Sequence, residues 1–394
     1  MKILIVTNYY YPETGAAPNR VTLMAEQLQF LGAEVEVICP LPNYPHGTIL
    51  KGYKFKLFKI EKINNIKLYR FFIFPSISKA FSARIFSMFS FAFSLWLFAF
   101  NYKSIKNTNL VIVQHSPLLV SFSAIVLFKK LFRKKIILNV SDLWPLSALE
   151  LGVIKKGNFY NLLEFIQKFN YNNAHSFIGQ SKEILSQISS YNNKSKILYR
   201  NIPRYIKPNI PVKSKSMKIV YAGLLGVAQG VFSIIENINF RNINIELHIY
   251  GDGTEKNKIK TYVSENPNCN IFIKDSLPKK ELDKIMSNFD ASLIPLRKSI
   301  YGAVPSKIFD VISHGLPVLF CGDGEGEKII LNNKLGFCSK SGDFSQLKLN
   351  LVKLKNLNKA DYLKLSRNCL NISKNKYNFQ NQILSLYNFL KKQH

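Results

Sequence analysis

The sequence predicts an α/β protein with two domains, each built around a parallel sheet. Short apolar runs alternate with helical patterns from the first residues onward, and this alternation favours strand–helix–strand units with helices on both faces of a sheet. The alternation stops near residues 200–216, where three prolines interrupt the chain, and then restarts. The 394 residues are long for one core and sufficient for two.

The first domain is expected over 1–199. It opens with a strand at 2–7, and a helix follows over 17–32, where apolar residues recur at helical spacing. Gly32 stands where a helix commonly stops. Further elements are expected as strands over 34–39, 110–114 and 135–141 and as a helix over 117–133.

The second domain is expected over 217–374, after a linker at 200–216. A last helix over 375–394 carries one apolar face and could pack back on the N-terminal domain. The strands of the second domain are expected, with helices between them, over 217–223, 245–251, 269–275, 289–296 and 316–322.

The composition is strongly basic. The formal net charge is +30, from 54 Lys and Arg against 24 Asp and Glu, and such an excess attracts anionic lipids, phosphorylated molecules or nucleic acid. A compositional bias toward Lys, Asn, Ile and Phe explains the same excess without a ligand. No base-reading helix, zinc-finger spacing or RNA-binding aromatic motif is present, so we expect no nucleic-acid partner.

Cysteine usage and the N-terminus indicate a cytoplasmic protein. The five cysteines lie far apart and form no CxxC pair, so neither a disulfide framework nor a zinc site is expected. The first apolar run is short and is followed by Tyr, Pro and Glu, which is unlike a secretory signal.

Two segments of the first domain could meet a membrane. Residues 85–102 carry no charge and are about 18 residues long, near the lower limit for a span. Three interpretations stay open for them: a span, contact with the membrane surface, or a buried core helix. Residues 123–135 combine apolar side chains with five basic ones, which suits either an anionic membrane surface or the solvated end of a core helix.

Two glycine-containing loops follow strands and suit a phosphate ligand. After the first strand, Gly15 and Ala16 let the backbone approach a ligand closely, at the positive end of the next helix. After the strand at 217–223, Gly223, Gly226 and Gly230 open another helix, although the spacing matches neither a Walker A box nor GxGxxG.

The stretch "PSKIFD" suggests a sugar–phosphate site. Pro305 suits the first turn of a helix, and Ser306 and Lys307 add a hydroxyl and a positive charge beside the free backbone N–H groups. Arg297 lies shortly before, and Asp310, one turn further, could accept hydrogen bonds from a ribose diol. A capped surface helix is the alternative interpretation.

The remaining candidates also lie at strand ends. His115 ends the strand at 110–114, and Asp142 and Trp144 follow the strand at 135–141 as a possible acceptor-site pair or as a helix cap and a packing aromatic. No HExxH, GxSxG or Asp-x-Asp motif is present, so we expect neither a metal nor a cofactor.

Taken in order along the chain, these motifs resemble the retaining GT-B glycosyltransferases of family four, and within it the WbuB-like branch. The resemblance rests on an ordered series that runs from residue 1 to about 345: "PETGAAPNR", "LPNYPHG", "QHSPLL", "SDLWPLSALELG", "YAGLLGVAQG", "YGDG", "IPLRKSIYGAVPSKIFDVISHGLPVL" and "GEGE". That branch serves bacterial O-antigen, capsule and related polysaccharide synthesis and includes FucNAc transferases.

The resemblance implies two Rossmann-like domains with parallel sheets facing across a cleft. It implies a UDP-sugar as donor substrate, with these residues at the donor: Gly15, Ala16, Gly223, Gly226, Gln229, Arg297, Pro305, Ser306, Lys307, Asp310 and Glu325. It implies Asp142, Trp144 and Tyr44 at the acceptor, and the candidate catalytic residues are Asp142, His115 and Lys307.

This chain departs from the family pattern at several positions. The usual Glu-x7-Glu signature becomes Gly302 and Asp310, so its first carboxylate is missing. The Lys common after the "GLLG" loop is Gln229, and the His found in many members after the strand at 135–140 is Ser141. Lys307 and Arg297 must then supply the positive charge, and neither the sugar nor the catalytic base is named by the motifs.

The resulting expectation is a retaining glycosyltransferase, peripheral at the inner face of the cell membrane. It would move a sugar, such as an N-acetylated amino or deoxyamino sugar, to a polyprenyl-diphosphate-linked saccharide. Two alternatives stay open on the same fold: a UDP-sugar 2-epimerase, and a non-catalytic partner that binds a nucleotide-sugar.

Overall fold

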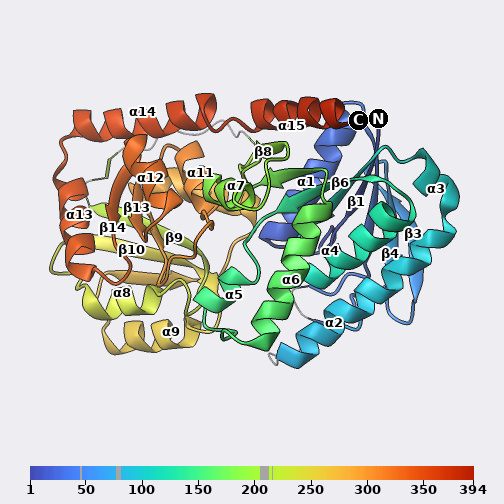
Figure 1. The fold of residues 1–394 in the computed structure, drawn as a ribbon. Helices are drawn as coiled ribbons and strands as arrows, with labels where there is room; N and C mark the ends of the chain where they lie inside the picture. The colour runs from blue at the N-terminus through green and yellow to red at the C-terminus, as the bar shows by residue number, and fades with distance from the viewer. Residues whose placement is uncertain (45–46, 77–80, 205–212, 215) are drawn as a thin grey trace. The chain divides into compact units, whose positions relative to one another are not determined.

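The computed structural model describes residues 1–394 except 45–46, 77–80, 205–212 and 215 (Figure 1). The chain divides into two compact units. The first contains Met1–Arg200 together with Gln380–His394, and the second contains Asn201–Phe379. Most of the linker expected at 200–216 lies outside the described residues.

The first unit is built on an eight-stranded sheet in the order β3-β4-β2-β1-β5-β6-β7-β8. All neighbouring strands pair in parallel except β3 and β4, which are antiparallel. The strands are β1 (Lys2–Val6), β2 (Glu34–Pro40), β3 (Phe58–Ile63), β4 (Ile66–Phe71), β5 (Leu110–Gln114), β6 (Lys135–Val140), β7 (Ser176–Gly179) and β8 (Lys196–Leu198).

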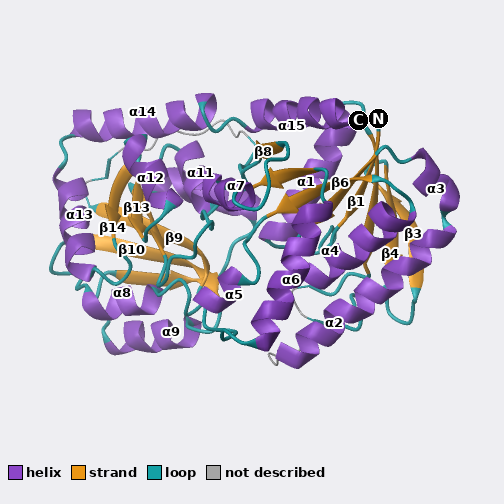
Figure 2. Cartoon of the chain, viewed as in Figure 1, coloured by secondary structure: helices purple, strands orange, loops and turns teal. Residues whose placement is uncertain are grey.

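Helices lie against this sheet and bury its apolar side chains (Figure 2). The expected helix over 117–133 is present as an α-helix that continues into a π-helical turn. The helical elements are α1 (Ala16–Phe30), α2 (Phe81–Ser94), η1 (Leu95–Phe100), α3 (Tyr102–Asn107), α4 (Leu118–Ile125), η2 (Val126–Leu131), α5 (Leu146–Glu150), α6 (Asn158–Asn173), α7 (Lys182–Ser189) and α15 (Phe379–Gln393).

The C-terminal helix α15 is part of the first unit although the chain reaches it from the second. The amide of Gln382 donates to the carbonyl of Arg200 and accepts from its backbone N–H, both at 2.8 Å. Near the other end of α15, the ammonium of Lys135 donates to the carbonyl of Gln393 at 3.0 Å. These bonds join one end of the helix to the segment after β8 and the other end to the first residue of β6.

The segment 85–102 forms α2, η1 and the start of α3 rather than one continuous apolar helix. One side of it is buried in the core, at Phe91, Leu95 and Phe98. Among the described residues, no helix combines the length and the apolar character needed to cross a membrane.

The second unit is built on a six-stranded, fully parallel sheet in the order β11-β10-β9-β12-β13-β14. The strands are β9 (Met217–Leu224), β10 (Ile245–Asp252), β11 (Ile271–Lys274), β12 (Ala291–Pro295), β13 (Val318–Cys321) and β14 (Gly336–Ser339). The helices are α8 (Val231–Asn237), α9 (Lys256–Glu265), α10 (Lys279–Ile285), η3 (Met286–Asn288), α11 (Lys307–Ser313), α12 (Glu325–Asn332), α13 (Phe344–Asn356) and α14 (Lys359–Asn375).

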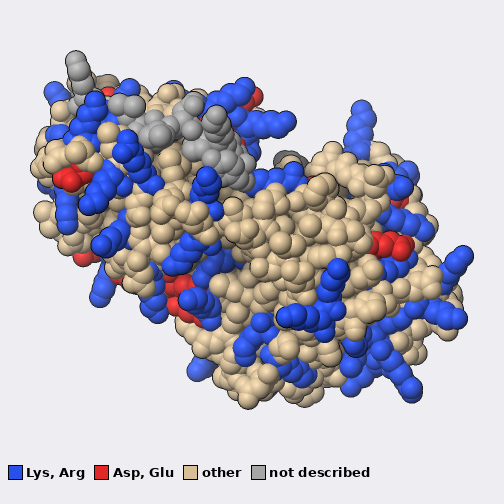
Figure 3. All heavy atoms as spheres, turned by 90° about the horizontal axis from the view of Figure 1, so that it is seen from above, with Lys and Arg blue, Asp and Glu red and all other residues tan. Residues whose placement is uncertain are grey.

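The predicted fold class is confirmed: both units are α/β with parallel sheets. The strands of the second sheet are apolar runs because both faces are covered, and Ile219, Ile249 and Leu293 in the middle of the sheet are buried. Figure 3 shows Lys and Arg side chains spread widely over one face of the molecule, with Asp and Glu at only a few places. The excess charge is therefore distributed on this face rather than gathered in one patch.

Candidate active site

The second sheet has a topological switch point between β9 and β12. From β9 the chain moves outward to β10 and β11, and it then returns to the other side of β9 with β12. In open parallel sheets, ligands bind outside the carboxyl ends of the strands at such a point. Gly223, near the end of β9, and Lys307, which follows β12, lie at this point.

The side chain of Lys307 lies against Gly223. A Cβ atom at position 223 would overlap the ammonium nitrogen and Cε of Lys307, so only glycine leaves room for the lysine there. Nζ of Lys307 also lies 3.4 Å from the hydroxyl of Tyr221 and 4.5 Å from the centre of its ring. The lysine is thus held at the switch point by a cation–π contact and by the missing side chain at Gly223.

The surroundings of Lys307 lower its pKa. Burial disfavours the charged ammonium and lowers the pKa from 10.5 to about 8, although Asp310 acts in the opposite direction. Tyr221, Pro305 and Ser306 supply no negative charge at neutral pH. An anion beside Nζ would raise the pKa again, so this cation suits a phosphate ligand.

The second motif, "YGDG", supports the glycine loop. The backbone N–H of Leu225 donates to the carbonyl of Asp252 at 2.8 Å, and the N–H of Glu255 donates to the carbonyl of Leu225 at 2.9 Å. Side chains at Gly251 or Gly253 would collide with the backbone of Gly223 or Leu225. The structure therefore uses these glycines for close packing of two loops.

Helix α11 starts at Lys307, so Pro305 lies just before the helix rather than in its first turn as the sequence predicts. Ser306 is the N-cap residue, and its side chain accepts no capping hydrogen bond. Gly302, which replaces the expected carboxylate, has φ 84°. A glutamate at that φ would be strained, so the missing carboxylate accompanies a loop conformation that favours glycine.

Asp310 belongs to a charged cluster at the outer side of α11. Its carboxylate pairs with Lys279, whose ammonium also lies 2.7 Å from Asp283. His314 Nε2 lies 3.1 Å from Asp283, and Asp283, Asp310 and His314 could each offer a metal ligand within 4.8 Å of one another. Because Lys279 already balances both carboxylates, the cation of this cluster is the lysine. The expected ribose contact of Asp310 stays a prediction.

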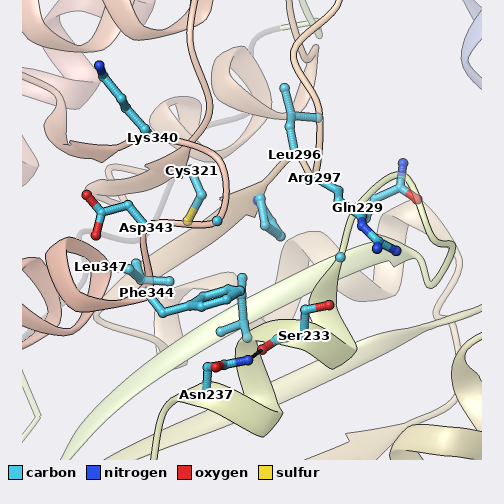
Figure 4. A pocket seen from close by; sticks show the side chains of 14 residues that line it. Gln229, Ser233, Asn237, Leu296, Arg297, Cys321, Lys340, Asp343, Phe344 and Leu347 are labelled. Carbon is cyan, nitrogen blue, oxygen red and sulfur yellow. Dashed lines mark hydrogen bonds between the residues drawn. The ribbon is translucent and has the colours of Figure 1, made fainter. Parts of the chain in front are cut away.

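Gln229 and Arg297 lie on the other side of the glycine loop and line a pocket of about 350 Å³. The N–H of Arg297 donates to the carbonyl of Ala228 at 2.8 Å, which fixes the loop after β12 against the loop after β9. The amide oxygen of Gln229 folds back toward Gly226, where a Cβ atom would lie 3.0 Å away. Figure 4 shows that the pocket is shared by α8, which contributes Ser233 and Asn237, by the ends of β12 and β13, and by the segment after β14 with the start of α13.

This pocket and the Lys307 region are different places. Lys307, Gly223 and Asp310 do not line the pocket, so the predicted donor residues fall into two groups. At Lys307 the lowered lysine pKa and the switch point coincide, and the phosphate-binding role of this residue stays a prediction. Glu325, another predicted donor residue, is buried at the first turn of α12, where the helix dipole favours an acid.

In the first unit, Gly15 and Ala16 begin α1 beside Tyr44. Gly15 has φ 138°, and a Cβ atom there would lie 3.0 Å from the ring of Tyr44. The buried carboxylate of Glu13 accepts from the backbone N–H groups of Tyr10, Asn43 and Tyr44 at 2.8 to 3.2 Å. Glu13 thereby joins the loops after β1 and β2 and positions Tyr44. Pro45 and His46 of the same motif lie outside the described residues.

Asp142 accepts a hydrogen bond from the hydroxyl of Ser116 at 2.5 Å. Burial raises the pKa of Asp142, and both Ser116 and the charge of Arg20 oppose this effect. Trp144 is partly buried and packs against a small core between α4, α5 and α6. The structure brings Asp142 and Ser116 together at the ends of β6 and β5, and the acceptor roles of Asp142 and Trp144 stay predictions.

His115 is completely buried and stacks near Tyr171, with ring centres 5.1 Å apart. Burial lowers its pKa to about 3, so the ring is neutral at pH 7. Neither ring nitrogen has a partner with good hydrogen-bond geometry among the described residues, although the backbone of Trp144 lies near the ring and partly opposes the lowering of its pKa. A neutral, inaccessible histidine can shape the strand end, and its catalytic assignment stays a prediction.

Four further residues of these sites were not identified from the sequence: Tyr221 under Lys307, Glu13 in the loop after β1, Ser116 beside Asp142, and Arg20 in α1. Tyr221 and Lys307 are separated by 86 positions, so no local pattern connects them. Arg20 could have been identified from the sequence, because it lies one helical turn after Ala16 and therefore on the same face of α1.

Solved structures share this two-unit α/β fold. Sucrose-phosphate synthase from Thermosynechococcus elongatus is 13% identical, with a TM-score of 0.74 over 99% of this chain and 98% of that one. The lipopolysaccharide outer core galactosyltransferase WaaB is 16% identical, with a TM-score of 0.62 over 98% and 99%. A structure titled trehalose-6-phosphate from E. coli, bound with UDP-2-fluoro glucose, is 10% identical, with a TM-score of 0.70 over 99% of both chains. The fold is therefore that of the GT-B glycosyltransferases.

Residues 204–376 match the family model described as glycosyl transferases group 1. This stretch covers the described part of the second unit almost completely and includes Gly223, Lys307 and Asp310. The second unit matches the glycosyl transferases group 1 model over most of its length, and this match together with the fold supports a glycosyltransferase enzyme. No curated protein matches the sequence of this chain.

Proposed function

We propose that this glycosyltransferase moves a sugar, with retention, from a UDP-sugar to a polyprenyl-diphosphate-linked saccharide in bacterial surface polysaccharide synthesis. The observation that supports a nucleotide-sugar donor is the position of the Lys307 ammonium, whose pKa is lowered by burial. It lies against Gly223 at the switch point of the second sheet. A cation in that place can bind the diphosphate of a nucleotide-sugar. Structural relatives whose titles name UDP-2-fluoro glucose and lipopolysaccharide galactosyl transfer support the choice of substrates.

The proposed chemistry is electrostatic. The bond between the sugar C1 and the diphosphate oxygen breaks, the acceptor oxygen bonds to C1 from the same face, and the acceptor proton passes to the departing diphosphate. Lys307 would stabilise the charge that grows on the leaving group. Pro305 and Ser306 would hold the phosphates beside it, Gln229 and Arg297 would border the donor loop, and Asp310 would reach the ribose after releasing Lys279.

A lipid-linked acceptor requires access to a membrane surface, and the first unit carries a candidate. We define the aromatic surface as Phe89, Phe93, Phe100, Tyr102 and Leu131, all of them exposed. Phe93 and Phe100 expose 82% and 88% of their area. Large apolar side chains gathered in this way are uncommon on a surface that meets only water.

The two segments that form the aromatic surface are neighbours. The indole N–H of Trp96 donates to the hydroxyl of Ser123 at 3.0 Å, and the rings of Tyr102 and Phe132 lie 6.4 Å apart. Residues 62–141 contain no Asp or Glu, and Lys103, Lys106, Lys130 and Arg133 are exposed around these segments. Apolar side chains with a purely basic rim complement an anionic bilayer, so we place the protein at the inner face of the cell membrane.

Transfer from a panel of UDP-sugars to membrane acceptors, detected by mass spectrometry, tests the proposed reaction. We expect turnover with one donor and its loss in Lys307→Ala. Incubation with UDP-N-acetylhexosamine alone tests the epimerase alternative, because product formed without an acceptor would contradict glycosyl transfer. Binding of a donor without any turnover would favour a non-catalytic partner.

Cosedimentation with phosphatidylglycerol and phosphatidylcholine vesicles tests the membrane surface. The double variant Phe93→Ser/Phe100→Ser should bind phosphatidylglycerol vesicles at least about tenfold more weakly, because two apolar anchors are lost. Phe30→Ser is the matched control, since Phe30 is also 82% exposed but lies at the end of α1. Equal effects of both changes, or equal binding to both lipids, would contradict the assignment.

A further inference from the structure

Four side chains from α10 and from the region of α11 form one charged cluster inside the second unit. Lys279 and Asp283 stand one turn apart on α10 and therefore lie on the same face of that helix. Asp310 belongs to α11, and His314 directly follows the last residue of α11. The ammonium of Lys279 donates a hydrogen bond to the carboxylate of Asp310. The carboxylate assigned above to the ribose is therefore already engaged by a cation of the protein.

Asp283 and His314 place two buried acceptor atoms next to each other. Oδ1 of Asp283 and Nε2 of His314 lie 3.1 Å apart. Nδ1 of His314 lies 3.0 Å from the carbonyl oxygen of Asp310, which can only accept, so Nδ1 carries the proton of the neutral ring and Nε2 carries a lone pair. Neither Asp283 Oδ1 nor His314 Nε2 has a partner with good hydrogen-bond geometry among the described residues. Two buried acceptors in contact are costly until a donor reaches both of them.

Lys279 is a donor within reach of this pair. Its ammonium already lies 2.7 Å from Oδ1 of Asp283, although this contact is not well aligned as a hydrogen bond. An ammonium has three N–H donors on a flexible stem, and 48% of this side chain is exposed, so small rotations about its bonds are open to it. Burial lowers the pKa of Lys279, but Asp310 and Asp283 raise it above its usual value, so the side chain keeps its charge beside either carboxylate.

We propose that Asp283 and His314 are positioning residues for donor binding. They receive the ammonium of Lys279 and so free the carboxylate of Asp310 for the ribose hydroxyls. The inference rests on the proposed function, in which Asp310 binds the ribose of a UDP-sugar. The exchange keeps Lys279 paired throughout, because the ammonium passes from one carboxylate to another, whereas removing its partner outright would be costly. It also gives the two buried acceptors their missing donor.

Asp283→Asn tests the exchange. The amide keeps the shape of the side chain but removes the charge that attracts Lys279, which then stays with Asp310. UDP should bind at least about fivefold more weakly, because the ribose must compete with the ammonium for Asp310. The second probe is 2′,3′-dideoxy-UDP, which lacks both ribose hydroxyls, and its affinity should stay the same. Both affinities are measured by calorimetry on the same protein, so a change in stability does not alter their ratio.

Three further variants complete the test. Adding Lys279→Met to Asp283→Asn removes the competing ammonium, so the affinity for UDP should return to within about twofold of the wild-type value. His314→Phe removes the second acceptor and should weaken UDP binding selectively, though less than Asp283→Asn does. Glu281→Gln is the matched control, since Glu281 is exposed on the same helix and should change neither affinity. In transfer assays, Asp283→Asn should raise the donor KM and leave kcat nearly unchanged.

An equal loss of affinity for both probes in Asp283→Asn would overturn the inference, because the cluster would then serve the fold alone. Unchanged UDP affinity, or a loss that Lys279→Met does not restore, would overturn it as well. Failure of the proposed function is distinguishable. If the wild type binds UDP more tightly than the dideoxy probe and Asp283→Asn keeps the same preference, only the exchange is wrong. If the wild type binds both probes equally or binds neither, the ribose contact of Asp310 is wrong, and the exchange falls with it.

Discussion

Replacing Lys307 with methionine should stabilise the protein and abolish donor binding at the same time. In the folded chain, burial lowers the lysine pKa from 10.5 to about 8. A depressed lysine pKa means that the charged form is disfavoured by folding, so the penalty is complete below pH 8 and disappears as the pH rises toward 10.5. At about 1.4 kcal/mol per pH unit, the penalty at pH 7 is up to about 3 kcal/mol.

Part of this gain is lost with the contact to Tyr221. A cation–π contact of this kind contributes about 0.5 to 1 kcal/mol, which leaves about 2 kcal/mol as the expected stabilisation of Lys307→Met. For a unit of 150 to 250 residues this corresponds to a rise of roughly 4 to 8 °C in melting temperature. Thermal unfolding at pH 7 and at pH 10 measures it, and the difference from wild type should shrink at the higher pH.

The same variant should no longer be stabilised by UDP or by a UDP-sugar. Lys258→Met is the control, because Lys258 is exposed on α9 and should change neither property. Wild-type donor affinity should also weaken as the pH rises above about 8, where the unliganded ammonium loses its proton. A destabilised Lys307→Met that still binds UDP normally would refute the argument, since Lys307 would then be a packing residue.

Three shorter predictions address the loops. Gly223→Ala should weaken donor binding more than it lowers stability, because the added Cβ displaces the flexible end of the Lys307 side chain. The control is Gly52→Ala, which is also at positive φ but lies in open space. In thermal unfolding it should show only the effect of backbone strain. Glu13→Ala should cost about 2 to 4 kcal/mol in urea unfolding by leaving backbone N–H groups unpaired, and Glu13→Gln should cost less, since one amide oxygen remains as an acceptor. The transfer rate of the wild type should fall as the pH drops toward the raised pKa of Asp142. Asp142→Asn should abolish this fall of the rate at acid pH. An unchanged fall in the variant would exclude Asp142 as the titrating group.

The alternation of strands and helices could be predicted because burial on both faces forces each parallel strand to be an apolar run. The β3–β4 hairpin was not predicted. Strand β3 alternates between exposed and half-buried residues, β4 is mostly buried, and the turn uses Asn64 and Asn65 at positive φ. Two consecutive asparagines at the turn were the available signal, but antiparallel pairing at the edge of an otherwise parallel sheet is not part of the repeating pattern.

The candidate site was predictable only where its residues are close in sequence. Pro305, Ser306 and Lys307 were assigned from one short motif after a strand, and the structure places them at the switch point. The pairing of Lys279 with Asp310 and the contact of Tyr221 with Lys307 depend on distances between separate elements.

The net charge of +30 and the candidate phosphate cation Lys307 act in different ways. Exposed Lys and Arg are screened within about 10 Å at 0.1 M salt, so they can concentrate anions near the surface but cannot select one. Burial lowers the pKa of Lys307, and this residue lies at the switch point of the second sheet against Gly223. Screening weakens such a buried charge much less than an exposed one. Donor specificity should therefore depend on Lys307, while the many surface charges mainly govern attraction to membranes and to phosphorylated substrates.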